Sequence, residues 1–86
     1  MADTVQAEPR IPTDQEKKLD ELFTYHPPEN DEQLRGYNAV RQWGLALAKV
    51  ICEFTPKGSD QSAAIRKVRE AVMTANAAIA LKGLNF

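Results

Sequence analysis

The sequence predicts an all-α protein in which a short N-terminal helix precedes a long antiparallel helical hairpin, and the hairpin assembles as a homo-oligomer. Apolar residues recur at spacings of three and four along residues 31–54 and 60–82, and neither stretch contains proline. Prolines and glycines gather before and between these stretches, where the chain must turn. With 86 residues, the chain has room for one small domain.

Residues 1–12 precede the periodic part of the chain. They carry polar residues throughout, lack hydrophobic periodicity and contain two prolines. Such a segment cannot bury enough apolar surface to become ordered. We therefore expect a flexible tail, followed by a single helical-hairpin domain over residues 13–86.

The first helix is expected over residues 14–25. Thr13 followed by Glu16 matches a capping box, in which the two side chains satisfy backbone N–H groups at the helix start. Pro27 and Pro28 stop the helix, because proline lacks an N–H and pushes the residue before it out of the α conformation. The helix is short and must dock on something through a narrow apolar stripe, which consists of Leu19, Leu22 and Phe23.

The second helix is expected over residues 31–54, capped either by Asn30 together with Gln33 or by Asp31. Two adjacent apolar rows give it a broad face. One row contains Leu34, Tyr37, Arg41, Gly44, Ala48 and Ile51, and the other contains Val40, Trp43, Leu47, Val50 and Phe54. Glycine inside a helix costs about 1 kcal/mol relative to alanine, so Gly36 and Gly44 mark either a close backbone approach or a chance placement.

The third helix is expected over residues 60–82, with Ser59 or Asp60 as its cap and Gly83 at its end. At about 1.5 Å per residue, each long helix spans roughly 35 Å. Two such rods in contact along one seam leave the second apolar stripe of each uncovered, and self-association is the simplest way to cover it. The main stripe of this helix consists of Ile65, Val68, Val72, Ala75 and Ile79.

Composition excludes several classes of function. A formal net charge of −1 gives no overall cationic field for DNA or RNA, although residues 1–34 are acidic and residues 35–86 are basic. One cysteine and one histidine cannot form an intrachain disulfide or a four-ligand zinc site. The N-terminus lacks the features of an export signal, and no apolar run is long enough to span a membrane. We expect a cytosolic protein.

The sequence gives little support for an enzymatic function. Metal-dependent helical bundles need several facing carboxylates, whereas the two long helices offer scattered ones such as Glu53 and Glu70. His26 lies in the loop after the first helix, away from the elements that carry Cys52 and Ser59. No glycine-rich phosphate loop is present. We expect neither catalysis nor a cofactor.

Several residues fit ligand binding, each with a structural alternative. The prolines after Tyr25 and His26 hold the chain stiff, so the ring of Tyr25 either stacks on a base or caps the core. Arg41 lies in an apolar row and either reaches past the seam to water or meets a buried anion. Asn76 either fixes helix register or reads the edge of a base. The basic run at residues 66–69 is either solvated or contacts phosphate.

Three sequence blocks occur in a distinctive order: F-T-Y-H-P-P at residues 23–28, G-Y-N-A-V-R at residues 36–41 and R-E-A-V-M-T-A-N-A-A-I-A at residues 69–80. Together they resemble the phage anti-CBASS protein family and its anti-Thoeris relatives, which share one helical-hairpin domain. The likeness extends over residues 19–82, and the last block is its most specific part.

The resemblance implies a phage immune-evasion protein in the cytoplasm of the infected bacterial host. Such proteins bind and sequester cyclic second messengers without cleaving them. It further implies a homo-oligomer, typically a hexamer of interlocked dimers, with cyclic dinucleotides such as 3′,3′-cyclic GMP-AMP held between subunits. Some members also bind cyclic trinucleotides, and the anti-Thoeris branch binds cyclic ADP-ribose isomers. DNA, RNA polymers and membranes are not expected partners.

The resemblance also implies the ligand-binding residues. Tyr25 matches the aromatic residue that stacks on a base, and Arg41 matches the cation that meets a phosphate. The other implied contacts shape or line the pocket: His26, Pro28, Arg69, Met73 and Asn76. The competing hypotheses are a structural oligomerisation module and a small DNA-binding regulator with no nucleotide ligand. The regulator fits less well, because the third helix is rich in alanine beyond Arg69.

Overall fold

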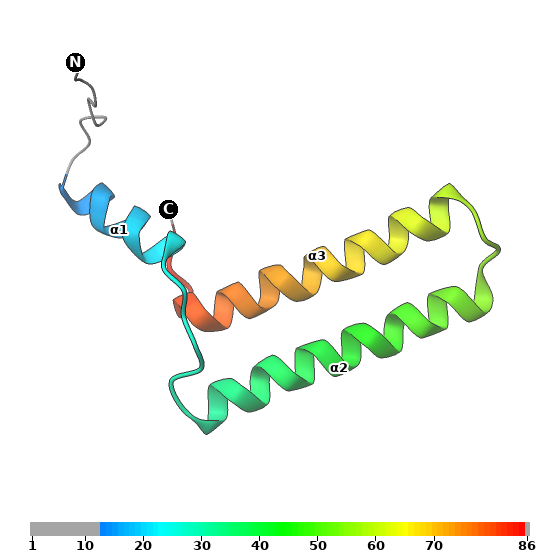
Figure 1. Cartoon of the computed structure of the whole chain (residues 1–86), viewed down its shortest axis with the longest axis horizontal. Coiled ribbons are helices and arrows are strands. Elements are labelled where there is room, and N and C mark those ends of the chain that lie inside the picture. Colours follow the sequence, from blue (N-terminus) through cyan, green and yellow to red (C-terminus); the bar gives the residue numbers. More distant parts are fainter. Residues whose placement is uncertain (1–12, 86) are drawn as a thin grey trace, which may run out of the picture.

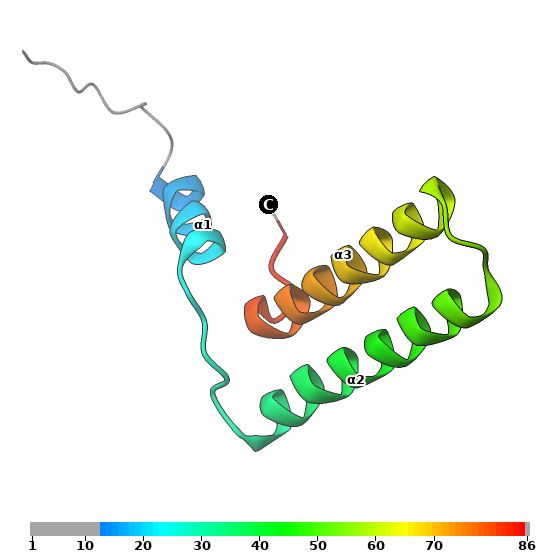
Figure 2. The ribbon, with the colours of Figure 1, turned by 45° about the vertical axis from the view of Figure 1, so that its right-hand side comes forward.

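The computed structural model describes residues 13–85, so the expectation for the tail at residues 1–12 falls outside the described part of the chain. The described residues form α1 (Thr13–Phe23), α2 (Asp31–Phe54) and α3 (Ser59–Leu81), and they contain no strand. The predicted all-helical class is thus confirmed. Helices α2 and α3 run antiparallel side by side, whereas α1 stands off the open end of the hairpin (Figure 1). The second view shows the same separation of α1 from α2 and α3 (Figure 2).

Helix α1 ends at Phe23 rather than at Tyr25. The reason is that side chains from the following loop bind the carbonyl groups of its last turn. Thr24 Oγ1 donates to the Asp20 carbonyl at 2.5 Å, and the Nε2 of His26 donates to the Glu21 carbonyl at 2.8 Å. Such side-chain bonds replace the backbone bonds that a longer helix would make. None of the residues of α1 is buried.

Helix α2 is capped by Asn30, which has an extended backbone and accepts a hydrogen bond from the Gln33 N–H at 2.8 Å. Asn30 is therefore the cap, and Asp31 is the first residue of the helix. The far end of α2 is closed by Thr55, whose N–H and hydroxyl both donate to the carbonyl of Ile51. The helix thus has side-chain support at both ends.

The cap expected for α3 is wrong. Neither Ser59 nor Asp60 caps the helix, because α3 already begins at Ser59 and Gly58 occupies the capping position with no side chain to offer. The turn is held instead by Gln61, whose amide donates to the Thr55 carbonyl at 3.0 Å and to its hydroxyl at 3.1 Å. At the other end α3 stops at Leu81, because Lys82 adopts the left-handed conformation with φ 54° and ψ 37°.

The seam between α2 and α3 is narrow. Tyr37, at 7% exposure, is the one buried residue in the described chain. The glycines of α2 mark where the helices approach most closely: a Cβ on Gly36 would lie 3.1 Å from Ile79 Cδ1, and a Cβ on Gly44 would overlap Val72 Cγ2. The close-approach alternative therefore explains both glycines. Half-buried residues line the rest of the seam, namely Ala48, Ile51, Ile65, Val68, Val72, Ala75 and Ile79.

The second apolar row of α2 remains uncovered. Trp43 is 76% exposed and Phe54 is 75% exposed, while Leu47 and Val50 are about half exposed. Large apolar side chains in a contiguous exposed row mark an interaction surface more often than a solvated face. Within residues 13–85, no helix has the length and hydropathy to span a bilayer.

We predict that Gly44→Ala lowers the free energy of unfolding by about 1–3 kcal/mol, because the added methyl group must displace Val72, a β-branched residue with little rotamer freedom in a helix. Gly36→Ala is the matched control, since its methyl group meets the mobile end of Ile79 and alanine favours the helix. Denaturant titration at one protein concentration measures both. Equal stability of the two variants would contradict the close approach at Gly44.

We also predict that Asn30→Ala lowers the free energy of unfolding by about 1 kcal/mol through loss of the bond to the Gln33 N–H. Asn38 lies exposed within the same helix, so Asn38→Ala should be neutral or slightly stabilising. The same denaturant titration distinguishes the variants. If Asn38→Ala costs as much as Asn30→Ala, the capping interpretation fails.

Candidate functional site

The loop at residues 24–30, called here the proline loop, connects α1 to α2. Its Tyr25 ring is 83% exposed, although the residues on both sides of it, Thr24 and His26, are bound to the end of α1. The His26 side chain is 18% exposed and its Nε2 also lies 3.9 Å from the carboxylate of Glu21. The next two residues are prolines, which restrict the backbone. The loop therefore presents an uncovered aromatic ring on a stiff support.

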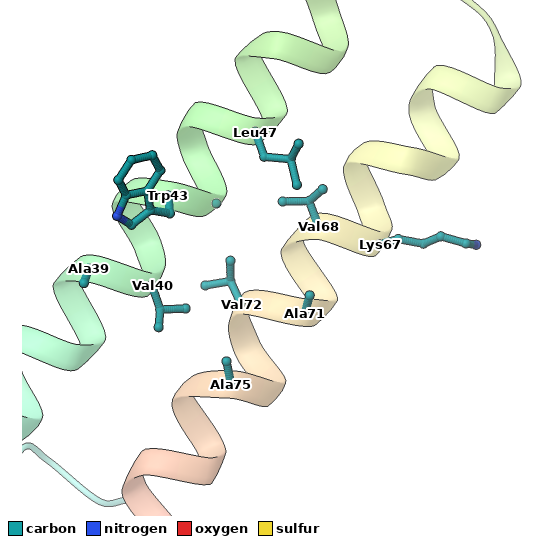
Figure 3. Close-up of a pocket in the computed structure, with 10 residues that line it drawn as sticks. Ala39, Val40, Trp43, Leu47, Lys67, Val68, Ala71, Val72 and Ala75 are labelled. Carbon is teal, nitrogen blue, oxygen red and sulfur yellow. The ribbon is translucent and has the colours of Figure 1, made fainter.

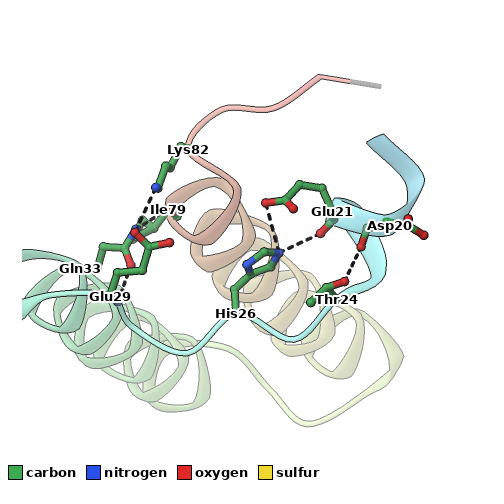
Figure 4. A network of polar contacts seen from close by, with 8 residues as sticks. All are labelled: Asp20, Glu21, Thr24, His26, Glu29, Gln33, Ile79 and Lys82. Atoms are coloured by element: carbon green, nitrogen blue, oxygen red, sulfur yellow. Dashed lines mark hydrogen bonds and ion pairs between the residues drawn. The ribbon is translucent and has the colours of Figure 1, made fainter. Parts of the chain in front are cut away.

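The other end of the proline loop is attached to both long helices (Figure 4). The N–H of Glu29 donates to Gln33 Oε1 at 2.9 Å, and Gln33 Nε2 donates to the carbonyl of Ile79 at 3.2 Å. The carboxylate of Glu29 also lies 3.0 Å from the ammonium group of Lys82, at the end of α3. The loop is thus held where the N-terminus of α2 meets the C-terminus of α3.

One open groove, called here the Trp43 groove, follows one side of the seam (Figure 3). Its volume is about 570 Å³. Trp43 and Leu47 border it from α2, Val68 and Val72 border it from α3, and the Lys67 side chain points away from it. The groove offers almost no polar group to a ligand, so its surface suits an apolar protein partner.

A second groove, called here the arginine groove, follows the other side of the seam, with a volume of about 370 Å³. Arg41 of α2 and Arg69 of α3 line it together with apolar side chains that include Leu45 and Met73. Among residues 13–85, Lys82 pairs with Glu29 and His26 lies 3.9 Å from Glu21, so neither guanidinium has a carboxylate partner there. Both arginines are exposed, and two unpaired cations beside apolar side chains suit an anion with flat, apolar parts.

The structure brings together some of the residues singled out in the sequence and separates others. Arg41, Arg69 and Met73 line the arginine groove, and Asn76 follows Met73 on the same face of α3. The proline loop, with Tyr25, His26 and Pro28, lies off the open end of the hairpin. Arg41 is about 15 Å along α2 from that end, at 1.5 Å per residue. Within one chain, the two groups of residues therefore form separate surfaces.

Two polar atoms inside the hairpin lack hydrogen-bond partners, namely Tyr37 Oη and Asn76 Oδ1. Unpaired buried polar atoms are rare, and each costs free energy until a partner satisfies it. Asn76 therefore does not fix the register of this hairpin through a hydrogen bond of its side-chain oxygen. That oxygen stays buried in the hairpin without a hydrogen-bond partner.

The side chains considered for catalysis lie far apart in the described part of the chain. Cys52 lies about 30 Å along α2 from the end that carries the proline loop, so it cannot pair with His26 within one chain. No three side chains from His, Cys, Asp and Glu gather as metal ligands within residues 13–85. The exposed ring and the unpaired guanidinium groups are suited to binding: the first by stacking, the second by charge and hydrogen bonds.

Sequence reasoning missed the contacts that attach the proline loop to α3. It identified Gln33 as part of a helix cap, but not as a donor to Ile79, which lies 46 residues away. It likewise did not identify the pair of Glu29 and Lys82. Local patterns carry no signal for such contacts. The available hint was the antiparallel hairpin itself, which brings the start of α2 next to the end of α3.

Comparison with known proteins places this geometry in a family. No curated protein and no solved structure matches the chain. The family model described as the Acb2/Tad1 hairpin domain matches residues 15–80, which is more than half of the chain and includes the proline loop, all of α2 and most of α3. The sequence blocks at residues 23–28, 36–41 and 69–80 all fall within the match. The chain therefore belongs to the Acb2/Tad1 hairpin-domain family.

Proposed function

We propose that this protein binds and sequesters cyclic dinucleotide second messengers such as 3′,3′-cyclic GMP-AMP without cleaving them, and so blocks CBASS antiviral signalling in the infected bacterial cell. Membership of the Acb2/Tad1 hairpin-domain family supports a phage sponge-type function, which is sequestration rather than catalysis. Cyclic trinucleotides and cyclic ADP-ribose isomers are further candidate ligands.

The observation that carries the proposal is the uncovered ring of Tyr25. A tyrosine at 83% exposure in a loop attached at both ends has an open face and little backbone freedom left to lose on binding. Stacking of a base on an aromatic ring contributes about 1–3 kcal/mol per base, and it does not depend on which base is present. The loop thus suits a nucleotide ligand.

The arginine groove suits the charge of a cyclic dinucleotide. A cyclic dinucleotide carries two phosphates and two bases, and it therefore needs two cationic contacts and two stacking surfaces. Arg41 and Arg69 supply guanidinium groups that no carboxylate neutralises in the described chain. Guanidinium groups bind phosphate oxygens through paired hydrogen bonds.

The site needs a second copy of the chain. One protomer offers one Tyr25, and this residue lies far from the arginine groove of the same hairpin. A two-fold assembly doubles each group and sets the loop of one protomer against the groove of its partner, which matches a symmetric ligand. The apolar Trp43 groove gives such an assembly a surface to bury. We propose a hexamer built from interlocked dimers.

A capture experiment tests the function. The purified protein is incubated with 3′,3′-cyclic GMP-AMP, free ligand is removed, the protein is heat-denatured, and the released material is separated by chromatography. Intact nucleotide in stoichiometric amount is expected. A linear product would show an enzyme, and no bound nucleotide would favour an oligomerisation module or a DNA-binding regulator. Capture should also stabilise the fold by roughly 2.7 kcal/mol at a hundredfold excess over Kd.

We predict that Tyr25→Ala and Arg41→Ala each weaken retention of 3′,3′-cyclic GMP-AMP by about 5- to 150-fold, since each removes a stacking or charged contact worth about 1–3 kcal/mol. Isothermal titration calorimetry measures the change in Kd. Tyr25→Phe keeps the ring and should bind almost normally. Arg35→Ala removes the same charge from the surface that faces away from the arginine groove, and it should have little effect.

The same titrations separate the assigned residues from the function. If wild-type protein retains the nucleotide and both alanine variants retain it equally well, the site lies elsewhere on the molecule. If Arg35→Ala weakens binding as much as Arg41→Ala, the effect reflects overall charge rather than a contact at the groove.

A further inference from the structure

The position of Tyr25 relative to the hairpin depends on the proline loop. Helix α1 does not hold it there, because no residue of α1 is buried and Phe23 is 83% exposed. Thr24 and His26 bind the loop to α1, but these bonds do not connect the loop to α2 or α3. The attachment to the hairpin must come from the other end of the loop.

Gln33 is the centre of that attachment. Its backbone N–H donates to Asn30 Oδ1 at 2.8 Å, its side-chain oxygen accepts from the N–H of Glu29 at 2.9 Å, and its side-chain nitrogen donates to the carbonyl of Ile79 at 3.2 Å. The first two bonds lie within the helix start. The third crosses from the first turn of α2 to α3, and we call the three together the Gln33 clamp.

The other link across this junction is the ion pair of Glu29 and Lys82. Their side chains are 49% and 64% exposed, so solvent and salt screen the attraction, and an exposed pair of this kind contributes little by itself. The Gln33 side chain is half-buried and its bonds are directional. The clamp is therefore the stronger constraint on Glu29.

Rigidity can pass from Glu29 to Tyr25 through the intervening residues. Pro27 and Pro28 have φ fixed by their rings and restrict the residues before them. His26 in turn is bound to the last turn of α1. With Glu29 held, few backbone torsions remain free between the hairpin and Tyr25.

We propose that Gln33 is a positioning residue that, through its bond to the Ile79 carbonyl, fixes the proline loop on α3 and holds Tyr25 in the orientation that receives a base. This inference rests on the proposed function, because it assigns Gln33 a role in binding by way of Tyr25. Gln33 itself touches no part of the ligand surface described above. Its effect on affinity comes from a lower entropy cost of binding.

Two substitutions separate positioning from helix capping. Gln33→Met has a similar length and loses both side-chain bonds without adding charge. Gln33→Glu keeps an oxygen that accepts from the Glu29 N–H, and so preserves the cap, but it cannot donate to Ile79. Gln42→Met is the matched control on an exposed position of α2. Titrations run in high salt screen the carboxylate added by Gln33→Glu.

We predict that Gln33→Met and Gln33→Glu each weaken binding of 3′,3′-cyclic GMP-AMP by about three- to tenfold, because both lose the hydrogen bond to the Ile79 carbonyl. In ligand-free protein, the backbone ¹⁵N order parameters of Tyr25 and His26 should fall from about 0.85 toward 0.6. Gln42→Met should change neither quantity. The titration is done well below the midpoint of thermal unfolding of every variant.

Each result is decisive. Unchanged order parameters in both Gln33 variants overturn the inference, whatever happens to stability. Weaker binding by Gln33→Met but not by Gln33→Glu also overturns it, because the cap alone would then explain the effect. Should wild-type protein bind no cyclic nucleotide, the proposed function fails, and the order parameters still decide whether Gln33 holds the loop.

Discussion

The narrowness of the seam between α2 and α3 is the constraint on which the rest of the structure depends. Two helices in contact along one line bury only one side of each. Tyr37 is the one buried residue in the described chain. Burial of apolar surface contributes about 25 cal/mol per Å², so an isolated hairpin of this kind gains little. The exposed rings of Trp43 and Phe54 show where further burial is available. Burial of this face by a partner is the physical reason for the self-association that we propose.

The same geometry divides the hairpin into two unlike surfaces. Gly44, Val68 and Val72 border both grooves, because the seam separates them. On one side the lining is apolar, and on the other it includes two exposed arginines, Arg41 and Arg69, beside apolar side chains. A protein partner on the arginine side would have to bring acidic residues to pair with both cations. A dianionic ligand can satisfy them. The distribution of charge therefore favours protein on the Trp43 groove and ligand on the arginine groove.

Features that depend on residues close in sequence, such as helices and caps, could be predicted from the sequence. Contacts between residues far apart in sequence could not. Helical periodicity placed the seam row of α2, and the Asn30 pattern predicted a cap that the structure contains. The cap of α3 was predicted wrongly. Helix capping is usually inferred from a polar side chain, whereas Gly58, which has none, occupies the capping position. The bond from Gln33 to Ile79 had no local signal. The register of α2 against α3 decides which polar residues line the same groove. Helical periodicity does not predict that register.

Sequestration places a different demand on a site than catalysis does. An enzyme must release its product, whereas a protein that captures a messenger works only while the complex lasts, so a slow dissociation rate is the useful property. If the loop that carries Tyr25 were flexible, binding would have to order it. The lost conformational entropy would weaken the complex. The proline loop avoids much of this cost, because Thr24 and His26 hold it at one end and Glu29 at the other. The stiffness of the loop is thus as much a part of the proposed site as the Tyr25 ring that it carries.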